Sequence, residues 1–349
     1  MIARKHATSA LLSLSLACAL PSLAAAADAS SLATPQTPAP QVNLGDTAAI
    51  WTVQAENASI STSHTADRDY TNGLRVGYVS PEGALPDALQ SLGHTLWGSG
   101  QQRLGFDISQ QFYTPLDNTS GNPPKGDHPF AATLMVTSSL IQESRSSLAR
   151  LTLGLGLVGP DALGEDVQNG FHDLIGQHQT KGWDTQLHDE PLLEITSERT
   201  WRLPMGKLGA LETDALPNLT AGIGNLRDYA APGVTVRLGQ GLDADYGVAR
   251  IRPGMTGTDV YHNVRPLAWY VFAGLDGQIV GHDLTVEGNT WRDSRGATLI
   301  PWQAEFQAGV AIIFHGVRVS YTQVAQTQEY KHQKGGLHQL GSFALSARF

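Results

Sequence analysis

The sequence contains a single cysteine, Cys18, and this residue lies in an apolar stretch near the N-terminus. Arg4 and Lys5 precede the apolar stretch, and the small residues of "SLAAAADAS" follow it. A basic start, an apolar middle and a small-residue cleavage site are typical of a secretory signal peptide, so we expect residues 1–27 to be removed. The exported chain then has no cysteine for a disulfide, a thiolate metal site or a cysteine nucleophile.

Beyond this signal the sequence lacks the run of roughly 18 apolar residues that a membrane-spanning helix needs. It also lacks an excess of basic charge, because 23 Lys and Arg stand against 32 Asp and Glu. Loss of the signal peptide makes the chain more acidic still, which disfavours nucleic acid as a partner. If the chain enters a membrane, it must therefore do so as a β-barrel.

The rest of the chain divides into two parts by composition. Residues 28–44, "DASSLATPQTPAPQVNL", are rich in Ala, Ser, Thr and Pro, which predicts a flexible leader. Residues 45–349 show few stretches of helical period and many that alternate with period two, which indicates one all-β domain.

The alternating stretches carry charge on their polar face. In 302–314, for example, Phe306 and Val310 share the apolar face, and Glu305 lies on the other. The last stretch, "GSFALSARF", ends on Phe349, and a terminal aromatic residue at the close of such a strand is typical of outer-membrane barrels. This pattern indicates an apolar outer surface around a wet interior.

We therefore predict a transmembrane antiparallel β-barrel of about twelve strands, with both termini in the periplasm because the number is even. The predicted strands are 48–56, 72–80, 102–114, 131–142, 148–158, 191–203, 209–225, 229–239, 267–281, 301–314, 317–328 and 338–349. A soluble two-sheet sandwich is the alternative, but it would have to hide charges in its core or expose whole apolar strand faces.

The predicted connections alternate mostly between short turns and long loops, as expected of these barrels. Two connections, 81–101 and 240–266, are long although they fall on the short-turn side. The first contains "PDALQSLGHTLW", which predicts an amphipathic helix lying on the membrane surface.

The long loops hold the candidate chemistry. His172 is the best general-base candidate, because imidazole titrates near neutral pH and can take a proton from water attacking an ester. Lys125 beside two prolines could hold a phosphate as a point charge, and Asp67 and Asp69 could bind a hard cation through oxygen ligands. For His172 and Lys125 a surface-loop residue without such a role is the commoner case, and two acids beside Arg68 more often form a surface charge cluster.

Several segments, in the same order and along essentially all of the mature chain, resemble the outer-membrane lipid A 3′-O-deacylase (LpxR-type) family. They are "DRDYTNGLRVGY", "QQFYTPLDN", "PPKGDHPFAA", "LGLVGPDALGEDVQNGFHDLIG", "KGWDTQLHDEP" and "TQEY", with the terminal "F". The resemblance implies a twelve-stranded barrel in the bacterial outer membrane, acting on lipid A or lipopolysaccharide as a monomer. It also implies a calcium-dependent hydrolysis that removes the 3′-acyloxyacyl group, at a site near the outer leaflet.

The resemblance also assigns roles to residues. In the family's pattern the His of a Q-x3-H motif activates water, and here that residue is His172, four after Gln168. Asn57 matches the Asn that ends the first strand, and Thr71 matches the Thr after Asp-Tyr. Lys125 matches the Lys before Gly-Asp, a candidate contact to a lipid A phosphate or sugar.

Two departures from the family's pattern each remove a carboxylate. Ala58 stands where an Asp usually follows the first-strand Asn, and His178 stands where the characterised deacylase has an acid six residues after the catalytic His. Asp67, Asp69 and Asp173 are nearby acids that could substitute. The alternative to an active hydrolase is therefore a catalytically impaired barrel that persists as a structural or lipid-binding protein.

Overall fold

The computed structural model describes residues 46–61, 68–176, 178–251 and 258–349, all within one compact unit. The predicted signal peptide and leader, and Asp67, lie outside the described residues. The strands are β1 Ile50–Asn57, β2 Asp69–Val79, β3 Gln101–Thr114, β4 Ala131–Glu143, β5 Ser147–Val158, β6 Glu190–Trp201, β7 Leu203–Leu208, β8 Leu211–Gly224, β9 Arg227–Gln240, β10 Leu267–Asp283, β11 Trp302–Phe314, β12 Val317–Gln326 and β13 His338–Arg348. The α-helices are α1 Asp87–Trp97, α2 Gly164–Ile175 and α3 Leu284–Glu287, and the 3-10 turns are η1 Ala58–Ile60, η2 Pro160–Ala162, η3 Trp183–Thr185 and η4 Leu242–Ala244.

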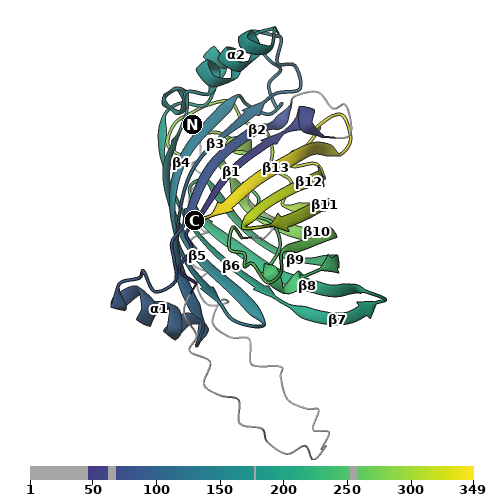
Figure 1. Ribbon diagram of the computed structural model, residues 1–349. Coiled ribbons are helices and arrows are strands. Elements are labelled where there is room, and N and C mark those ends of the chain that lie inside the picture. The colour runs from purple at the N-terminus through teal and green to yellow at the C-terminus, as the bar shows by residue number, and fades with distance from the viewer. Residues whose placement is uncertain (1–45, 62–67, 177, 252–257) are drawn as a thin grey trace, which may run out of the picture. The chain divides into compact units, whose positions relative to one another are not determined.

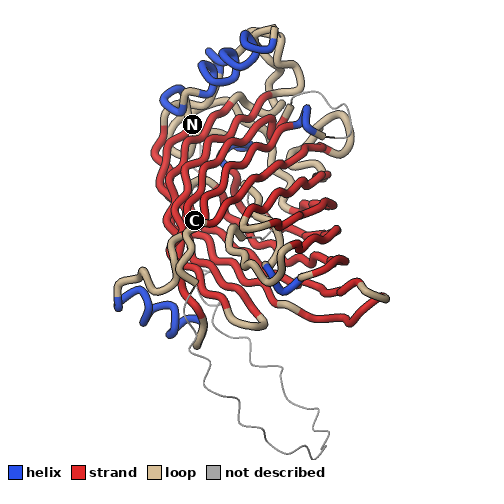
Figure 2. Tube along the Cα trace, in the orientation of Figure 1, coloured by secondary structure: helices blue, strands red, loops and turns tan. Residues whose placement is uncertain are grey.

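The strands form a closed antiparallel barrel (Figures 1 and 2). Each strand pairs with its neighbours in sequence, β1 pairs with β13, and β6 pairs with both β5 and β8. β6 and β7 are two parts of one long strand, because both pair with β8 and only Arg202 separates them. The thirteen segments therefore make the twelve barrel strands that the alternation predicts.

One predicted turn is misplaced. The sequence suggests a short turn over 204–209, but β7 continues to Leu208, which pairs directly with Leu211. Gly209 has a φ of +64°, a left-handed conformation that glycine adopts without steric cost and that suits a two-residue hairpin. The turn therefore forms at Gly209 and Ala210, and the strand before it is longer than expected.

Exposure alternates along the strands and separates the two faces of the wall. Phe106 and Ile108 of β3 and Val136 of β4 are exposed, whereas Arg75 and Asp107 are buried. The charged face lies inside the barrel and the apolar face outside, as the sequence indicates. None of the helices in the described part of the chain is long and apolar enough to cross a membrane.

The two ends of the barrel differ. At one end β1 begins and β13 ends, and we call it the N/C end, after these two strand ends. The other is the α2 end, after the helix that Figure 1 labels there. The N/C end carries three short turns, α1 and the long connection between β9 and β10. The α2 end carries the longer loops with η1, α2 and α3.

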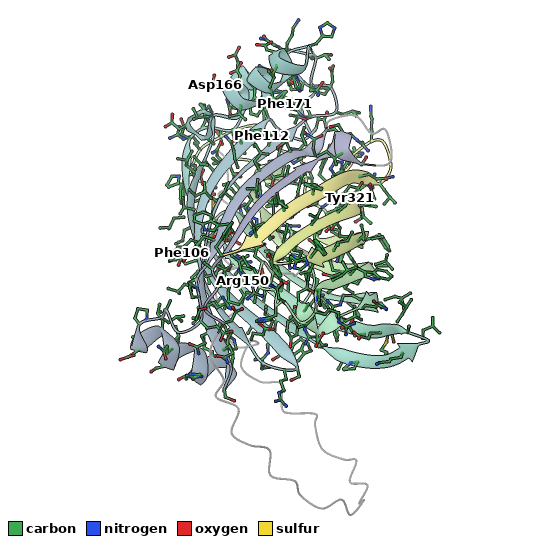
Figure 3. The ribbon with its side chains drawn as sticks, viewed as in Figure 1. Phe106, Phe112, Arg150, Asp166, Phe171 and Tyr321 are labelled. Atoms are coloured by element: carbon green, nitrogen blue, oxygen red, sulfur yellow. The ribbon has the colours of Figure 1, made fainter. Side chains whose placement is uncertain are left out.

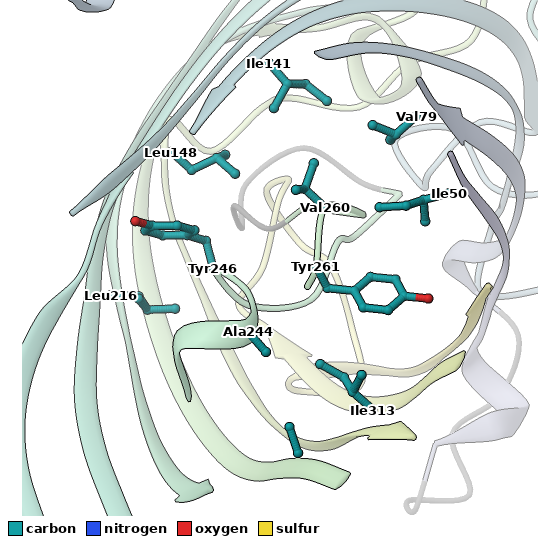
Figure 4. Close-up of a cluster of buried hydrophobic side chains, with 11 residues drawn as sticks. Ile50, Val79, Ile141, Leu148, Leu216, Ala244, Tyr246, Val260, Tyr261 and Ile313 are labelled. Carbon is teal, nitrogen blue, oxygen red and sulfur yellow. The ribbon is translucent and has the colours of Figure 1, made fainter. Parts of the chain in front are cut away.

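The connection between β9 and β10 folds into the lumen. Its residues Tyr246, Val260 and Tyr261 pack with strand residues such as Ile50 and Ile313 in one buried apolar cluster (Figure 4). This explains why the connection is long although it lies on the side of the short turns: it fills the barrel at the N/C end.

Buried ion pairs attach this connection to the wall. Asp259 accepts two hydrogen bonds from the Arg75 guanidinium, at 2.7 and 2.8 Å. Arg250 bridges Glu56 of β1 (3.1 Å) and Glu305 of β11 (2.8 Å). Because β1 and β11 are not neighbouring strands, such pairs join separate parts of the wall through the lumen.

Candidate active site at the α2 end

The loop between β5 and β6 packs against the outer face of the wall. Phe112 of β3 belongs to the outward-facing series of Phe106 and Ile108, yet it is buried against Trp183, with ring centroids 6.4 Å apart. Gln110, also in that series, donates a hydrogen bond to the Ala162 carbonyl at 2.5 Å. The loop and α2 therefore lie on the same side of the wall as the apolar surface, not inside the lumen. The sequence did not predict this helix.

α2 presents His172 from its buried side. The His172 side chain is 8 % exposed, and its Nδ1 lies 2.8 Å from the His178 carbonyl oxygen. A carbonyl can only accept, so Nδ1 carries the proton and Nε2 is left as the basic nitrogen. Among the described residues no hydrogen-bond partner of Nε2 is found, so this nitrogen is free to accept a proton from water.

The chain after α2 turns back to supply that carbonyl. Gly176, with a φ of +70°, ends the helix. Asn169 then holds the returning chain, because its Oδ1 accepts from the Thr180 amide at 2.8 Å and its Nδ2 donates to the Thr180 carbonyl at 3.3 Å. The sequence does not indicate this clamp, since no sequence pattern reveals a backbone acceptor.

Gln168, the first residue of the Q-x3-H motif, is also buried and oriented. Its Oε1 accepts a hydrogen bond from Trp183 Nε1 at 3.0 Å. Trp183 is itself fully buried among Phe112 and Phe130. The amide of Gln168 is thereby turned so that its NH2 group points away from Trp183.

Asn57 and Thr71 come from adjacent strands at the same end of the barrel. Asn57 ends β1 and pairs with Asn72 of β2; its side chain caps η1 by accepting from the Ser59 amide at 2.6 Å. Thr71 lies at an irregularity in the pairing of β2 with β3, and its hydroxyl lies 2.7 Å from that of Thr114. Bulges of this kind often adjoin active sites, where they redirect a side chain.

Lys125 lies on the neighbouring loop between β3 and β4, and its side chain is exposed. That loop touches the α2 loop, because the Lys181 amide donates to the Asn118 carbonyl at 3.0 Å. The predicted residues His172, Asn57, Thr71 and Lys125 thus belong to one end of β1–β5 and the loops that connect them.

Asp69 is engaged in a separate buried cluster. Its two carboxylate oxygens lie 2.9 Å from the Tyr330 hydroxyl and 2.8 Å from Gln333 Nε2. The same hydroxyl lies 2.8 Å from Asp127. Burial, with the nearby charges of Asp69 and Asp127, raises the pKa of Tyr330. Asp69 therefore ties the start of β2 to the loops before β4 and β13.

The described residues do not form an evident calcium site. Calcium takes six to eight oxygen ligands, but within the described ranges no three His, Cys, Asp or Glu side chains gather as a metal site would require. Ala58 is fully buried and His178 is exposed, so neither position supplies a carboxylate. The calcium prediction and the ligand roles of Asp67 and Asp69 stay predictions.

These features define a class: an outer-membrane β-barrel that carries a buried histidine on a helix at one end of the barrel. The chain belongs to the LpxR family, because residues 11–349 match the family model described as "Outer membrane protein LpxR". Among curated protein sequences no match is found.

One solved structure supports the fold. LpxR from Salmonella typhimurium superimposes with a TM-score of 0.70 at 23% sequence identity, covering 86% of this chain and 100% of that one. Two autotransporter barrels match less well. The β domain of the Bordetella autotransporter BrkA has a TM-score of 0.40 at 10% identity, covering 87% of this chain and 98% of its own. The AIDA-I transport unit from Escherichia coli has a TM-score of 0.32 at 10% identity, covering 90% of this chain and 92% of its own.

Proposed function

We propose that the protein hydrolyses the 3′-acyloxyacyl ester of lipid A, with His172 as the general base. The observation that carries this proposal is the hydrogen bond from His172 Nδ1 to the His178 carbonyl, which leaves Nε2 as a proton acceptor. In this role Nε2 takes a proton from water as the water attacks the ester carbonyl, and the imidazolium then returns the proton to the leaving alkoxide. Family membership and the Q-x3-H motif support the choice of substrate.

The surroundings of His172 suit a lipid substrate. Leu163, just before α2, and Phe171 and Leu174 of the helix are all more than half exposed, Leu174 by 82 %. Apolar side chains so exposed on a helix favour contact with lipid over water. We propose that these side chains contact acyl chains in the outer leaflet, which requires the α2 end to face the cell exterior and both termini to face the periplasm.

The oxyanion formed by water attack needs hydrogen-bond donors. The NH2 groups of Gln168 and Asn57 and the Thr71 hydroxyl are the donors that these elements offer, and Lys125 is the cation available for a phosphate or sugar of lipid A. We derive no step through a metal ion, because the described residues do not fit a calcium cage, and we propose that any calcium dependence is weak.

A replacement of His172 by Gln tests the proposal. The protein is expressed in a Gram-negative host, and lipid A is examined by mass spectrometry. Loss of the acyloxyacyl group should occur with the original protein and fall by about 10²–10⁴-fold with His172→Gln, the usual contribution of a general base. His178→Gln serves as a matched control, because His178 holds His172 through its backbone carbonyl, and this variant should keep its activity.

The alternative is a barrel that binds lipid A without cleaving it. Ala58 and His178, which lack the usual carboxylates, are the observations that favour it. Intact lipid A that co-purifies with the folded protein, and stays intact when calcium is added, would establish this alternative and refute the hydrolase. A pore is disfavoured, since the connection between β9 and β10 fills the lumen at the N/C end.

A further inference from the structure

Helix α1 packs on the outer face of the barrel wall at the N/C end. Gln102 of β3 and Gln142 of β4 belong to the outward-facing series of their strands, yet both are buried. Gln102 Nε2 donates to the Gln90 carbonyl of α1 at 3.1 Å, and Gln142 Nε2 donates to the Gly98 carbonyl that follows the helix at 3.0 Å. α1 therefore covers these two side chains, and Figure 1 shows the helix outside the barrel.

Gly93 allows the close approach. A Cβ at this position would lie 2.6 Å from Gln102 Nε2 and 3.2 Å from Gln142 Oε1, so a larger residue would have to displace these two glutamine side chains. Gly93 is also the buried residue of α1. It marks the side of the helix that faces the barrel.

The two flanks of α1 beside Gly93 differ in polarity. With 100° per residue, Ala88, Leu92 and Leu96 fall on one flank, and Leu92 and Leu96 are 41 % and 48 % exposed. Asp87 and Ser91, both exposed, fall on the far side. A helix with one apolar and one polar flank, held against a lipid-facing wall, suits the boundary between acyl chains and water.

The position of α1 along β3 agrees with a membrane boundary. The loop of α2 meets β3 at Gln110 and Phe112, and α1 meets it at Gln102, eight to ten residues away. With roughly 3.4 Å per residue and a strand tilt of about 40°, this separates the two contacts by roughly 20–26 Å along the barrel axis. The apolar band of such barrels is about 25 Å tall. Phe106, labelled on the wall between the two helices in Figure 3, lies within this interval.

The wall beside α1 has other features of a lipid contact. Trp51 and Tyr78 pack near the N/C end with ring centroids 5.0 Å apart and ring planes tilted by 55°, as in the aromatic girdles that mark membrane interfaces. Together with Phe106 and Val136 they line a shallow hollow of about 440 Å³ on the outer face. Its lining is apolar and matches acyl chains.

We infer that α1 is an interfacial anchor whose flank of Ala88, Leu92 and Leu96 rests in the acyl chains of the leaflet at the N/C end. The anchor fixes the depth of the barrel, and so the level at which α2 meets the opposite leaflet. This inference concerns placement in the membrane and holds whether or not the protein is a hydrolase.

Site-directed spin labels test the inference directly, since the chain after the signal peptide has no cysteine of its own. In the test variants a single cysteine replaces Leu92 or Leu96 on the apolar flank. In the matched controls it replaces Asp87 or Ser91, which are also four residues apart but lie on the polar side. Each protein is folded into phosphatidylcholine vesicles, and folding is checked by heat-modifiable migration on gels. Collision of the label with oxygen, which concentrates in lipid, is compared with collision with a water-soluble nickel chelate.

We expect the ratio of oxygen to nickel accessibility to be several-fold higher at 92 and 96 than at 87 and 91. Equal, nickel-dominated accessibility at all four positions would place α1 in water and overturn the inference. Exclusion of both reagents at 92 and 96 alone would show that protein covers the flank, which would also overturn it.

Discussion

The lumen at the N/C end and the candidate site at the α2 end are both polar. They differ in whether the buried basic side chains have partners for all of their polar atoms. In the lumen, Arg75 and Arg237 have short ion pairs with acids on two sides. At the α2 end, His172 uses one nitrogen for the backbone, and among the described residues the other has no partner. The comparison suggests that the lumen network holds the structure together, whereas the site keeps one acceptor available for chemistry.

The largest effect on stability should follow from breaking the lumen network. Asp259→Leu removes the two hydrogen bonds to Arg75 and should reduce the free energy of unfolding by about 3–5 kcal/mol, because it leaves buried positive charge poorly compensated. Urea unfolding in detergent, followed by tryptophan fluorescence, measures the change. Asp243→Leu is the matched control, since Asp243 is exposed in the same connection. Equal stability of the two variants would contradict a structural role of the network.

The next largest effect should come from the clamp behind His172. Asn169→Leu removes both contacts to Thr180 and frees the His178 carbonyl, so activity should fall by about 10–100-fold, as when outer partners of an active-site histidine are lost. Stability should change little, and the acid limb of the pH–activity profile should alter, because this limb reports protonation of the general base whose orientation is no longer fixed. Asn169→Asp, which keeps the acceptor for the Thr180 amide, should retain more activity than Asn169→Leu. An unchanged profile in the Leu variant would exclude Asn169 as a positioning residue.

A smaller effect concerns calcium and position 58. If any activity depends on calcium, the original protein should need far more of it than a relative with both acids, because each missing carboxylate weakens a calcium site. Ala58→Asp should lower the calcium concentration needed for half-maximal deacylation, and adding His178→Glu should lower it further. Saturation of the original protein at micromolar calcium, with no change in Ala58→Asp, would show that position 58 is outside the metal shell.

The smallest effect should be a pH dependence at the N/C end. Burial lowers the pKa of His262, but the hydrogen bond to Glu143 and the charge of Asp46 outweigh burial and raise it overall. Because the pKa is raised in the folded state, protonated His262 stabilises the fold. This stabilisation is fully present below the pKa of the unfolded state, about 6.5, and is lost as pH rises through the pKa of the folded state. Unfolding free energy should therefore fall by about 1 kcal/mol or less across this range. His262→Gln should abolish this part of the pH dependence in urea titrations.

Much of the fold could be predicted because the barrel imposes a strict period of two. An outward residue must tolerate lipid, and an inward residue must tolerate water or charge. The pattern in 302–314 or 338–349 therefore specifies that the segment is a strand and which of its side chains face the lumen. The turn over 204–209 was misplaced because Pro204 and Gly206 suggest a loop. In the structure a bulge between them accommodates both residues within β7. α1 could be predicted from its own apolar period, whereas α2 could not.

The sequence by itself determined that Cys18 is the one cysteine, that the chain is built of about twelve alternating strands, and that its motifs follow the order of a known family. The signal peptide stays a prediction. Only the tertiary structure decided that the 241–251 and 258–266 segments fill the lumen, that Asp69 bonds to Tyr330 and Gln333, and that the carbonyl of His178 orients His172. The physical reason is that alternation is a local property that each strand must satisfy alone. A backbone acceptor, an ion pair across the lumen or a helix against the outer wall arises from residues far apart in sequence, and it exists only once the barrel has closed.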